Sequence, residues 1–374
     1  MAEIHLILTC HDAGGATSVA IAETGMGIAS ISQDAIVTLR TARDQIEAML
    51  NGSPRMSSAV LLEFGLSMGR VLFAEDVRAT VMSNGNSVGN GASGGPLVAK
   101  ILATAEGLKG IPWEYAAWPP NYAGPLATKS VVRIVPQAQT ERCEPADLSK
   151  GLRVLLLSAN PIGLQGFSWQ QIRDRLVSLF QHDLPGLQLI ADDAKAPAGG
   201  AGFVRIVEAA IVKRVRKVIA DDDPHIVHFI AHGSHQGIVL VDSSTGQSAP
   251  LGLAGLSAAL GQAESLRLVI LSSCDGANAA FSPNPAGVGT LAEHLVRTAA
   301  PAVVASQMVL TETAVVPFCE GLYRELMQSG SIDAAVAAGR CALAIALDKP
   351  DSAAVEWGVP ALYRRMHCAQ LLKV

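Results

Sequence analysis

The chain has 374 residues, of which 49% are hydrophobic and 16% are charged, so most of it is expected to fold around a sizeable core. Its 28 basic and 33 acidic residues give a net charge of −5, which argues against a nucleic-acid partner because such proteins present a basic surface. No uninterrupted apolar stretch approaches the roughly 20 residues of a membrane-spanning helix, so no membrane partner is expected either.

The N-terminal third has a less regular pattern than the rest of the chain. The segments IHLILTC and TSVAIAE predict a hairpin, and two helices are expected over residues 33–50 and 57–73. Residues 82–96 have the composition of a surface loop, and LVAKILA and VVRIV are strand candidates. Between them lies PWEYAAWPP, whose Trp113 and Trp118 are expected in an interface core.

The remainder of the chain alternates strands with helices. Strands are predicted at VLLLS, LQLIADD, IVHFIA, GIVLV, LRLVILSS, AVVAS and VPALY. Helices are predicted over residues 168–180, 203–220 and 253–260, from about 290 to 298, and twice between AVVAS and VPALY. The helix over 203–220 rests on valine and isoleucine spacings of three and four. Such alternation predicts an α/β fold, a parallel-rich sheet covered by helices on both faces.

Four of the nine histidines fall within residues 225–237, where His228, His232 and His235 form an HxxxHxxH pattern. A zinc site would need this segment to be helical, but its β-branched residues favour a strand. His228 and His232 would then stand about 13 Å apart on a strand, too far for one zinc ion to bridge. We therefore expect no metal site.

A catalytic role for His232 needs a partner at another strand end, and Cys274 supplies one after the apolar strand LRLVILSS. In a parallel sheet, the carboxyl ends of strands gather functional groups. A histidine some tens of residues before a cysteine, with Gly276 two places after that cysteine, is the caspase arrangement. Either residue alone is more simply explained as a buried strand end, and the pair together favours catalysis.

Several segments together resemble the CHAT family of caspase-like cysteine peptidases, which is related to separases and caspases. The resemblance rests on HFIAHG and LVILSSCDG, supported by IPWEY, VVRIVPQ, LRVLLLSANP, AVVASQM, AVAAGRCAL and VEWGVPALY. It implies a caspase-like domain over residues 151–374 and a smaller α/β N-terminal region over 1–140. It also implies that Cys274 is the nucleophile and His232 the general base and acid. The backbone amides of Gly233 and Cys274 would then bind the oxyanion.

The expected substrate is a protein, cleaved without a cofactor, in a bacterial defence or cell-death pathway that the resemblance suggests. Ser272, Asp275, Ser306 and Gln307 are candidates for the substrate pocket because of their positions at strand ends. Three loops rich in small residues, at 85–95, 194–202 and 281–289, suggest a zymogen activated by an upstream protease or a regulatory partner.

The six cysteines show no CxxC pattern, and the N-terminus has no basic region before its apolar stretch, so we expect a cytoplasmic protein with reduced thiols. Two GxSxG matches, at 85–89 and 91–95, lie in a glycine-rich stretch without the strand and helix that a serine nucleophile requires. No GxGxxG follows a strand and opens a helix, as a dinucleotide site would require. The remaining alternative is a catalytically silent caspase-like module used for binding or as a scaffold.

Overall fold

The structure is a computed structural model. The residues it describes are 6–9, 17–21, 28–31, 41, 44, 65–69, 98–101, 111–116, 130–135, 143–164, 169–184, 186–197, 201–234, 237–272, 285–307, 310–347 and 356–374.

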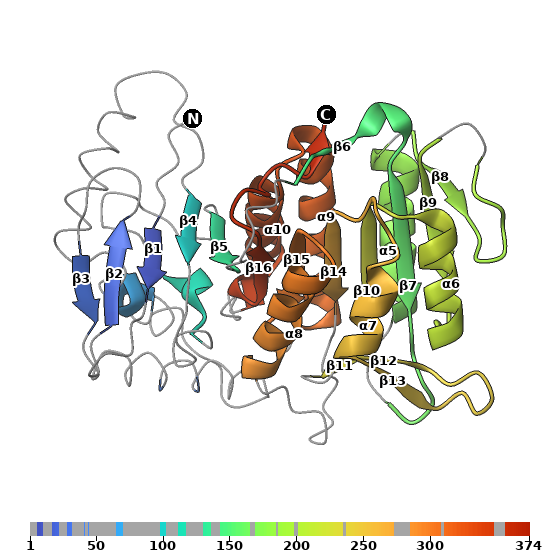
Figure 1. The fold of residues 1–374 in the computed structure, drawn as a ribbon, viewed down its shortest axis with the longest axis horizontal. Coiled ribbons are helices and arrows are strands. Elements are labelled where there is room, and N and C mark those ends of the chain that lie inside the picture. Colours follow the sequence, from blue (N-terminus) through green and yellow to red (C-terminus); the bar gives the residue numbers. More distant parts are fainter. Residues whose placement is uncertain are drawn as a thin grey trace.

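A nine-stranded mixed sheet forms the centre of the molecule (Figure 1). Six neighbouring strands, from β15 to β8, run parallel, and after an antiparallel junction β16, β5 and β4 run the other way. In spatial order the strands are β4 (Val98–Ile101), β5 (Ser130–Ile134), β16 (Pro360–Arg364), β15 (Ala302–Ser306), β14 (Leu268–Ser272), β10 (Ile226–Ile230), β7 (Arg153–Ser158), β9 (Phe203–Val207) and β8 (Gln188–Ile190).

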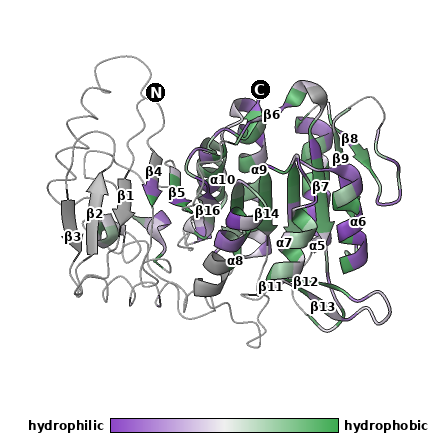
Figure 2. Ribbon diagram, viewed as in Figure 1, coloured by the Kyte–Doolittle hydropathy of each residue, from purple (hydrophilic) through white to green (hydrophobic). Residues whose placement is uncertain are grey.

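Helices cover both faces of this sheet, and the sheet itself is apolar (Figure 2). One core cluster packs beneath α5 (Trp169–Ser178), α9 (Glu312–Ser329) and α10 (Ile332–Leu347). The other packs beneath α6 (Val212–Asp222), α7 (Leu253–Leu260) and α8 (Pro285–Thr298). The predicted fold class, a parallel-rich sheet between two helical layers, is therefore confirmed.

The strand β10 shows how the central strands meet both layers. All five of its residues are buried. Ile226 and Ile230 belong to the cluster beneath α5, α9 and α10, whereas Val227 and Phe229 belong to the opposite cluster. Side chains alternate between the two faces of a strand, so a strand buried on both faces has an unbroken apolar sequence.

Three smaller sheets complete the described part of the chain. An antiparallel sheet at the N-terminus contains β1 (Leu6–Thr9), β2 (Thr17–Ile21) and β3 (Ile28–Ile31). A second contains β11 (Gly233–Ser234), β12 (Gly237–Val241) and β13 (Ser248–Gly252), and the third pairs β6 (Ala146–Asp147) with β17 (Leu372–Lys373). The short helices are η1 (Trp113–Tyr115), η3 (Leu148–Lys150), the π-helix η4 (Leu179–Asp183) and η7 (Glu356–Gly358).

The two ends of the parallel strands lie at opposite edges of the molecule. In Figure 1, β11, β12 and β13 lie at the bottom, just beyond the carboxyl end of β10. The strand β6, which precedes β7, lies at the top beside the C-terminus. The carboxyl ends of the parallel strands therefore lie at the lower edge in Figure 1, and functional groups are expected at that edge.

Most predicted elements of the C-terminal part are confirmed, but the helix predicted over 203–220 is wrong in its first half. Residues Phe203–Val207 form β9, between β7 and β8, and the helix α6 begins at Val212. A strand buried on both faces carries apolar residues at every spacing, so the valine spacing also matched a helix. The loop predicted over 275–289 is likewise shorter than expected, because α8 begins at Pro285.

In the N-terminal region, the predicted hairpin is confirmed as β1 and β2, and the two strand candidates are β4 and β5. Residues 65–69 are helical, as are Thr41 and Asp44, within the two predicted helices. Residues 82–96 lie outside the described part of the chain. Both β4 and β5 belong to the nine-stranded sheet, through the pairing of β5 with β16. The domain division at 140–151 stays a prediction.

Among the residues that the structure describes, none of the helices combines the length and the apolar character that crossing a membrane requires.

Candidate active site

His232 lies two residues beyond the end of β10, with only 6% of its surface exposed. Its backbone carbonyl accepts a hydrogen bond from the amide of Val239 at 2.8 Å. The next residue, Gly233, begins β11 and pairs with Ile238 of β12. The hairpin formed by β11 and β12 therefore fixes the backbone on the far side of the histidine.

The neighbouring strand β14 ends in register with β10. Ile230 is paired with Ser272 at the last position of both strands, and the amide of Ala231 donates to the carbonyl of Ser272 at 3.4 Å. His232 follows Ile230 by two residues, and Cys274 follows Ser272 by two residues. Cys274 itself, like Asp275, lies outside the described residues. The two predicted catalytic residues thus come after paired positions on adjacent parallel strands.

A buried polar cluster joins the ends of these two strands. The Nε2 of His228 lies 2.8 Å from the hydroxyl of Ser272, and its Nδ1 lies 3.0 Å from the hydroxyl of Tyr323 on α9. The Sγ of Cys319 is 3.9 Å from the same Ser272 hydroxyl. Burial lowers the pKa of His228 to about 3, so its imidazole is neutral at physiological pH. His228 is therefore a structural histidine of the core.

His225 has a similar structural role at the opposite end of β10. Its Nδ1 accepts a hydrogen bond from the amide of Arg153 at 3.0 Å, which joins β10 to β7. Burial, reinforced by Arg153 and Arg267, lowers its pKa to about 4. His235, the remaining histidine of the cluster, lies outside the described residues. The crowding of histidines thus reflects two structural residues close to the candidate catalytic one.

Two other predicted pocket residues lie at the end of the next strand, β15, where Ser306 is the last residue of the strand and Gln307 follows it. Ser306 and Gln307 are both 5% exposed. The amide oxygen of Gln307 accepts from Arg133 at 2.8 Å, and its nitrogen donates to Glu114 and to the carbonyl of Gly358, each at 2.8 Å. Ser272 is 4% exposed. These side chains are directed into the protein interior, and their contribution to a substrate pocket stays a prediction.

Gln307 belongs to a buried charge network that brings together four distant segments. Arg133 on β5 forms a bidentate ion pair with Glu114, through bonds of 2.9 and 2.7 Å. Arg340 on α10 lies 3.9 Å from Glu114 and donates two bonds to the carbonyl of Pro360. Burial raises the pKa of the Glu114 carboxyl, but Arg133 outweighs this effect and holds the pKa below its usual value. The network therefore retains its charges inside the protein.

The contacts of this network were not predicted, although its segments stand out in the sequence. Trp113, beside Glu114, is fully buried in the core, its expected position at an interface stays a prediction, and Trp118 lies outside the described residues. The available signal was a single charged residue inside an apolar segment, such as the arginine of VVRIV or of AGRCAL. Such charges are almost always paired when they are buried.

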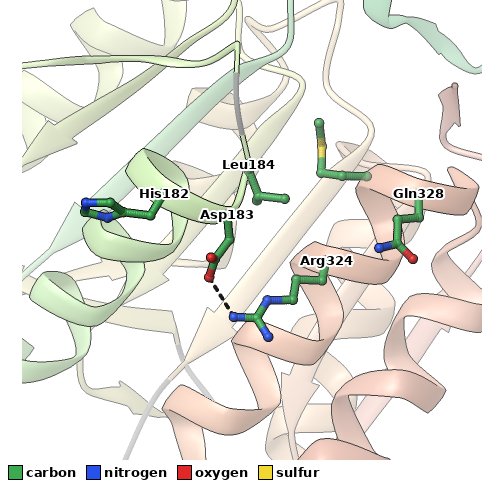
Figure 3. Close-up of a pocket in the computed structure, with 6 residues that line it drawn as sticks. His182, Asp183, Leu184, Arg324 and Gln328 are labelled. Carbon is green, nitrogen blue, oxygen red and sulfur yellow. Dashed lines mark hydrogen bonds and ion pairs between the residues drawn. The ribbon is translucent and has the colours of Figure 1, made fainter.

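A surface cavity of about 590 Å³ lies between the π-helix η4 and the second half of α9 (Figure 3). Arg324 and Asp183 form an ion pair of 2.6 Å at its wall. Since α9 starts from the carboxyl edge of the sheet and runs about 27 Å, these residues lie toward the opposite edge. This cavity is therefore separate from the strand ends that precede His232 and Cys274.

No group of three or more histidine, cysteine, aspartate or glutamate side chains in the described ranges is arranged to hold a metal ion. The arrangement at the carboxyl edge is instead one buried histidine, a glycine-containing hairpin and a paired strand that leads to a cysteine.

Comparison with known proteins extends this description. The model of the CHAT domain family matches residues 67–363, which is most of the chain. No curated protein matches the sequence.

Among solved structures, the Arg-specific cysteine proteinase gingipain R is 11% identical, and the match covers 89% of this chain and 76% of that chain with a TM-score of 0.47. The separase of the Saccharomyces cerevisiae separase–securin complex is 11% identical, with 90% of this chain but 23% of the separase chain covered and a TM-score of 0.43. A secreted C11 cysteine protease from Bacteroides thetaiotaomicron is also 11% identical, and the match covers 50% of this chain and 57% of that chain with a TM-score of 0.31.

Proposed function

This chain belongs to the CHAT domain family, and we propose that it is a cysteine endopeptidase in which His232 and Cys274 form the catalytic dyad. The observation that supports the dyad most directly is the register of Ile230 with Ser272, because each proposed catalytic residue follows one of these two by two positions. Adjacent strands lie about 4.8 Å apart, so two residues at matching offsets start from neighbouring backbone positions.

In the proposed reaction, the Cys274 thiolate attacks the carbonyl carbon of the scissile peptide bond. His232 accepts the thiol proton and then gives it to the departing amine, which leaves an acyl-enzyme. His232 next removes a proton from a water molecule that attacks the acyl carbon, and the thiol is regenerated. The hairpin after His232 supports this role because the hydrogen bond from the Val239 amide fixes the backbone of His232.

The hairpin also supports Gly233 as an oxyanion donor. The bond from the Val239 amide to the His232 carbonyl makes Gly233 and Ile238 a non-hydrogen-bonded pair of the antiparallel ladder. In such a pair the Gly233 amide points away from β12. Together with the amide of Cys274, it is the proposed pair of donors for the tetrahedral oxyanion.

The dyad can be tested without a known substrate by a thiol-reactive peptide analogue, such as a peptidyl chloromethyl ketone. We expect selective alkylation of Cys274 in the full chain, read by mass spectrometry of the digest, and its loss in His232→Ala. An exposed histidine provides the matched control, His367→Gln. Labelling of Cys274 no faster than of the other five cysteines would instead favour a catalytically silent binding module.

We further propose that the enzyme is made as a zymogen, in the cytoplasm, and that an upstream protease or a regulatory partner activates it. The segment 194–202 supports cleavage, since Lys195 and Ala196 are exposed after the turn that follows β8. If maturation depends on this segment, active samples contain two fragments that meet there. Full activity of an uncleaved chain would exclude this mode of activation.

The proposed substrate is a protein, and the proposed context is a bacterial defence or cell-death pathway, supported by family membership alone. The proposed pocket includes Ser272, Asp275, Ser306 and Gln307. Because the described side chains of this set face the interior, they are proposed to shape the pocket through the backbone rather than by contact with the substrate.

A further inference from the structure

Cys143 and Cys368 form a pair of contacting thiols, although they lie far apart in the sequence. The two thiols are hydrogen-bonded to each other, and the backbone amide of Cys143 donates to the sulfur of Cys368. Cys368 is fully buried in the core, whereas Cys143 is half-buried and packs against the same cluster. Cys143 is thus the more exposed residue of the pair.

The pairing of β6 with β17 holds the two cysteines together. Ala146 is paired with Leu372, and its amide donates to the carbonyl of Leu371 at 2.8 Å. Cys143 precedes its strand by three residues and Cys368 precedes the other by four, so they enter a parallel pair at nearly equal offsets. A disulfide requires Cβ atoms about 3.5–4.5 Å apart, and hydrogen-bonded thiols on paired segments need only a small displacement to form one.

This pair lies at the edge of the molecule opposite the proposed dyad. In Figure 1, β6 and the C-terminus are at the top, and the hairpin that follows His232 is at the bottom. Chemistry at Cys143 and Cys368 therefore does not consume any group of the proposed peptidase reaction.

The surroundings of the pair favour a reactive sulfur. The hydrogen bond with Cys143 lowers the pKa of Cys368 below its usual value against the effect of burial, with help from Arg365 and Arg364. Arg267 is close as well, and its Nε donates to the carbonyl of Glu144 at 2.7 Å. A hydrogen-bonded thiol pair beside cations loses its first proton more readily than an isolated thiol does, and the two sulfurs share the proton that remains.

We propose that Cys143 and Cys368 are a redox modification site, at which a hydroperoxide converts the two thiols into a reversible disulfide. The shared proton moves to Cys368, and the half-exposed Cys143 sulfur attacks one peroxide oxygen. The O–O bond breaks, Cys143 becomes a sulfenic acid, and the displaced hydroxide takes up a proton as water. The Cys368 sulfur then attacks Cys143, the S–O bond breaks, and a second water leaves. Two thiols lose two electrons, and one hydrogen peroxide is reduced to two waters.

The disulfide covalently joins the segment between β5 and β6 to the segment between β16 and β17. It closes a loop that contains every strand from β7 to β16. A cross-link over so long a loop stabilises the folded state mainly by restricting the unfolded chain. Oxidation therefore raises the melting temperature, and a thiol reductant reverses the increase.

The test uses the full-length reduced protein, treated with hydrogen peroxide, blocked with N-ethylmaleimide and digested with trypsin without reduction. The two cysteines fall in separate tryptic peptides, CEPADLSK and MHCAQLLK, each with a single cysteine. We expect the two peptides to appear cross-linked, and to separate when dithiothreitol is added before the block. Cys143→Ser removes the cross-link, and Cys341→Ser, at another half-buried cysteine, is the control that retains it.

A second measurement follows the melting temperature of the native state, and it uses no variant of the buried Cys368. Peroxide should raise the melting temperature of the wild type and of Cys341→Ser by a few degrees, and leave that of Cys143→Ser unchanged. Two separately blocked peptides from peroxide-treated wild type would overturn the proposal. A cross-link that forms only in unfolded protein, without a rise in melting temperature, would also overturn it.

Discussion

The Nε2 of His228 lies 2.8 Å from the hydroxyl of Ser272, so a side-chain hydrogen bond joins β10 to β14 two residues before the proposed nucleophile. Tyr323 on α9 completes the arrangement through the other ring nitrogen of His228. The paired ends of these strands are therefore held by side chains as well as by the backbone ladder. Ser272 therefore has a role in supporting the strand ends, and a mutation can distinguish that role from direct recognition of the substrate.

Ser272→Ala is expected to remove a partner from a buried ring nitrogen and to cost about 1–3 kcal/mol of unfolding free energy. Peptidase activity falls because the end of β14 is less well fixed, while the preferred residue at the cleavage position stays the same. Ser306→Ala, at the corresponding end of β15, is the comparison variant. Urea unfolding and peptide profiling check both parts. A changed cleavage preference at unchanged stability would place Ser272 in the substrate pocket.

Stability is expected to fall as the pH falls below about 6.5, because His225 and His228 have folded-state pKa values lowered to about 4 and about 3. The unfolded chain binds protons at both histidines before the folded protein does. Their contribution is complete above pH 6.5 and decreases by about 1.4 kcal/mol per pH unit for each histidine as the pH approaches 4. Urea unfolding at several pH values measures this slope.

His228→Gln should reduce the slope between pH 6.5 and 4 by about 1.4 kcal/mol per pH unit, whatever its effect on stability at pH 7. His367→Gln, at an exposed position, should leave the slope as it is in the wild type. Equal slopes in the wild type and His228→Gln would show that His228 is protonated in the folded protein.

The buried ion pair of Glu114 and Arg133 provides a third prediction. Arg133→Met leaves the Glu114 carboxylate buried without its main partner, so we expect a loss of about 3–5 kcal/mol. Lys217→Met breaks an exposed ion pair with Asp221 and should leave the free energy of unfolding almost unchanged, because solvent screens this pair. Chemical denaturation of both variants makes the comparison. Similarly small losses of unfolding free energy in the two variants would mean that the buried network contributes little to the stability of the fold.

A substitution at Gly237 tests how far stability and activity depend on the hairpin after His232. Its φ of +150° is accompanied by a close approach, since a Cβ atom there would lie 2.1 Å from the carbonyl oxygen of Leu251. Gly237→Ala should therefore cost about 3 kcal/mol or more and displace the proposed oxyanion donor Gly233, with loss of activity. Gly186→Ala, at a φ of +97° with open space around it, should cost about 1 kcal/mol and retain activity.

The order of strands and helices was largely predictable because the central strands and covering helices differ in apolar period. The helix α7 coincides with the predicted range 253–260, and the register of β10 with β14 is compatible with the predicted meeting of their ends. The strand β9 was missed because a strand buried on both faces has no alternation to distinguish it from a helix.

The polar networks could not be predicted because their members come from distant parts of the chain. Glu114 and Gln307 are separated by 193 residues, and His228 and Tyr323 by 95. A sequence shows that a charged residue lies in an apolar segment, but not which partner the fold provides. The contact between Cys143 and Cys368 depends in the same way on the pairing of β6 with β17.

A randomised peptide library read by mass spectrometry tests the claim that this chain is a peptidase with a His232–Cys274 dyad. Wild type, Cys274→Ala, His232→Ala and His367→Gln are compared, before and after limited cleavage of the segment 194–202. We predict cleavage by wild type and His367→Gln, none by Cys274→Ala, and rates at least about 100-fold lower for His232→Ala. Cleavage that persists in Cys274→Ala, or the absence of cleavage by wild type in both states, would contradict the claim.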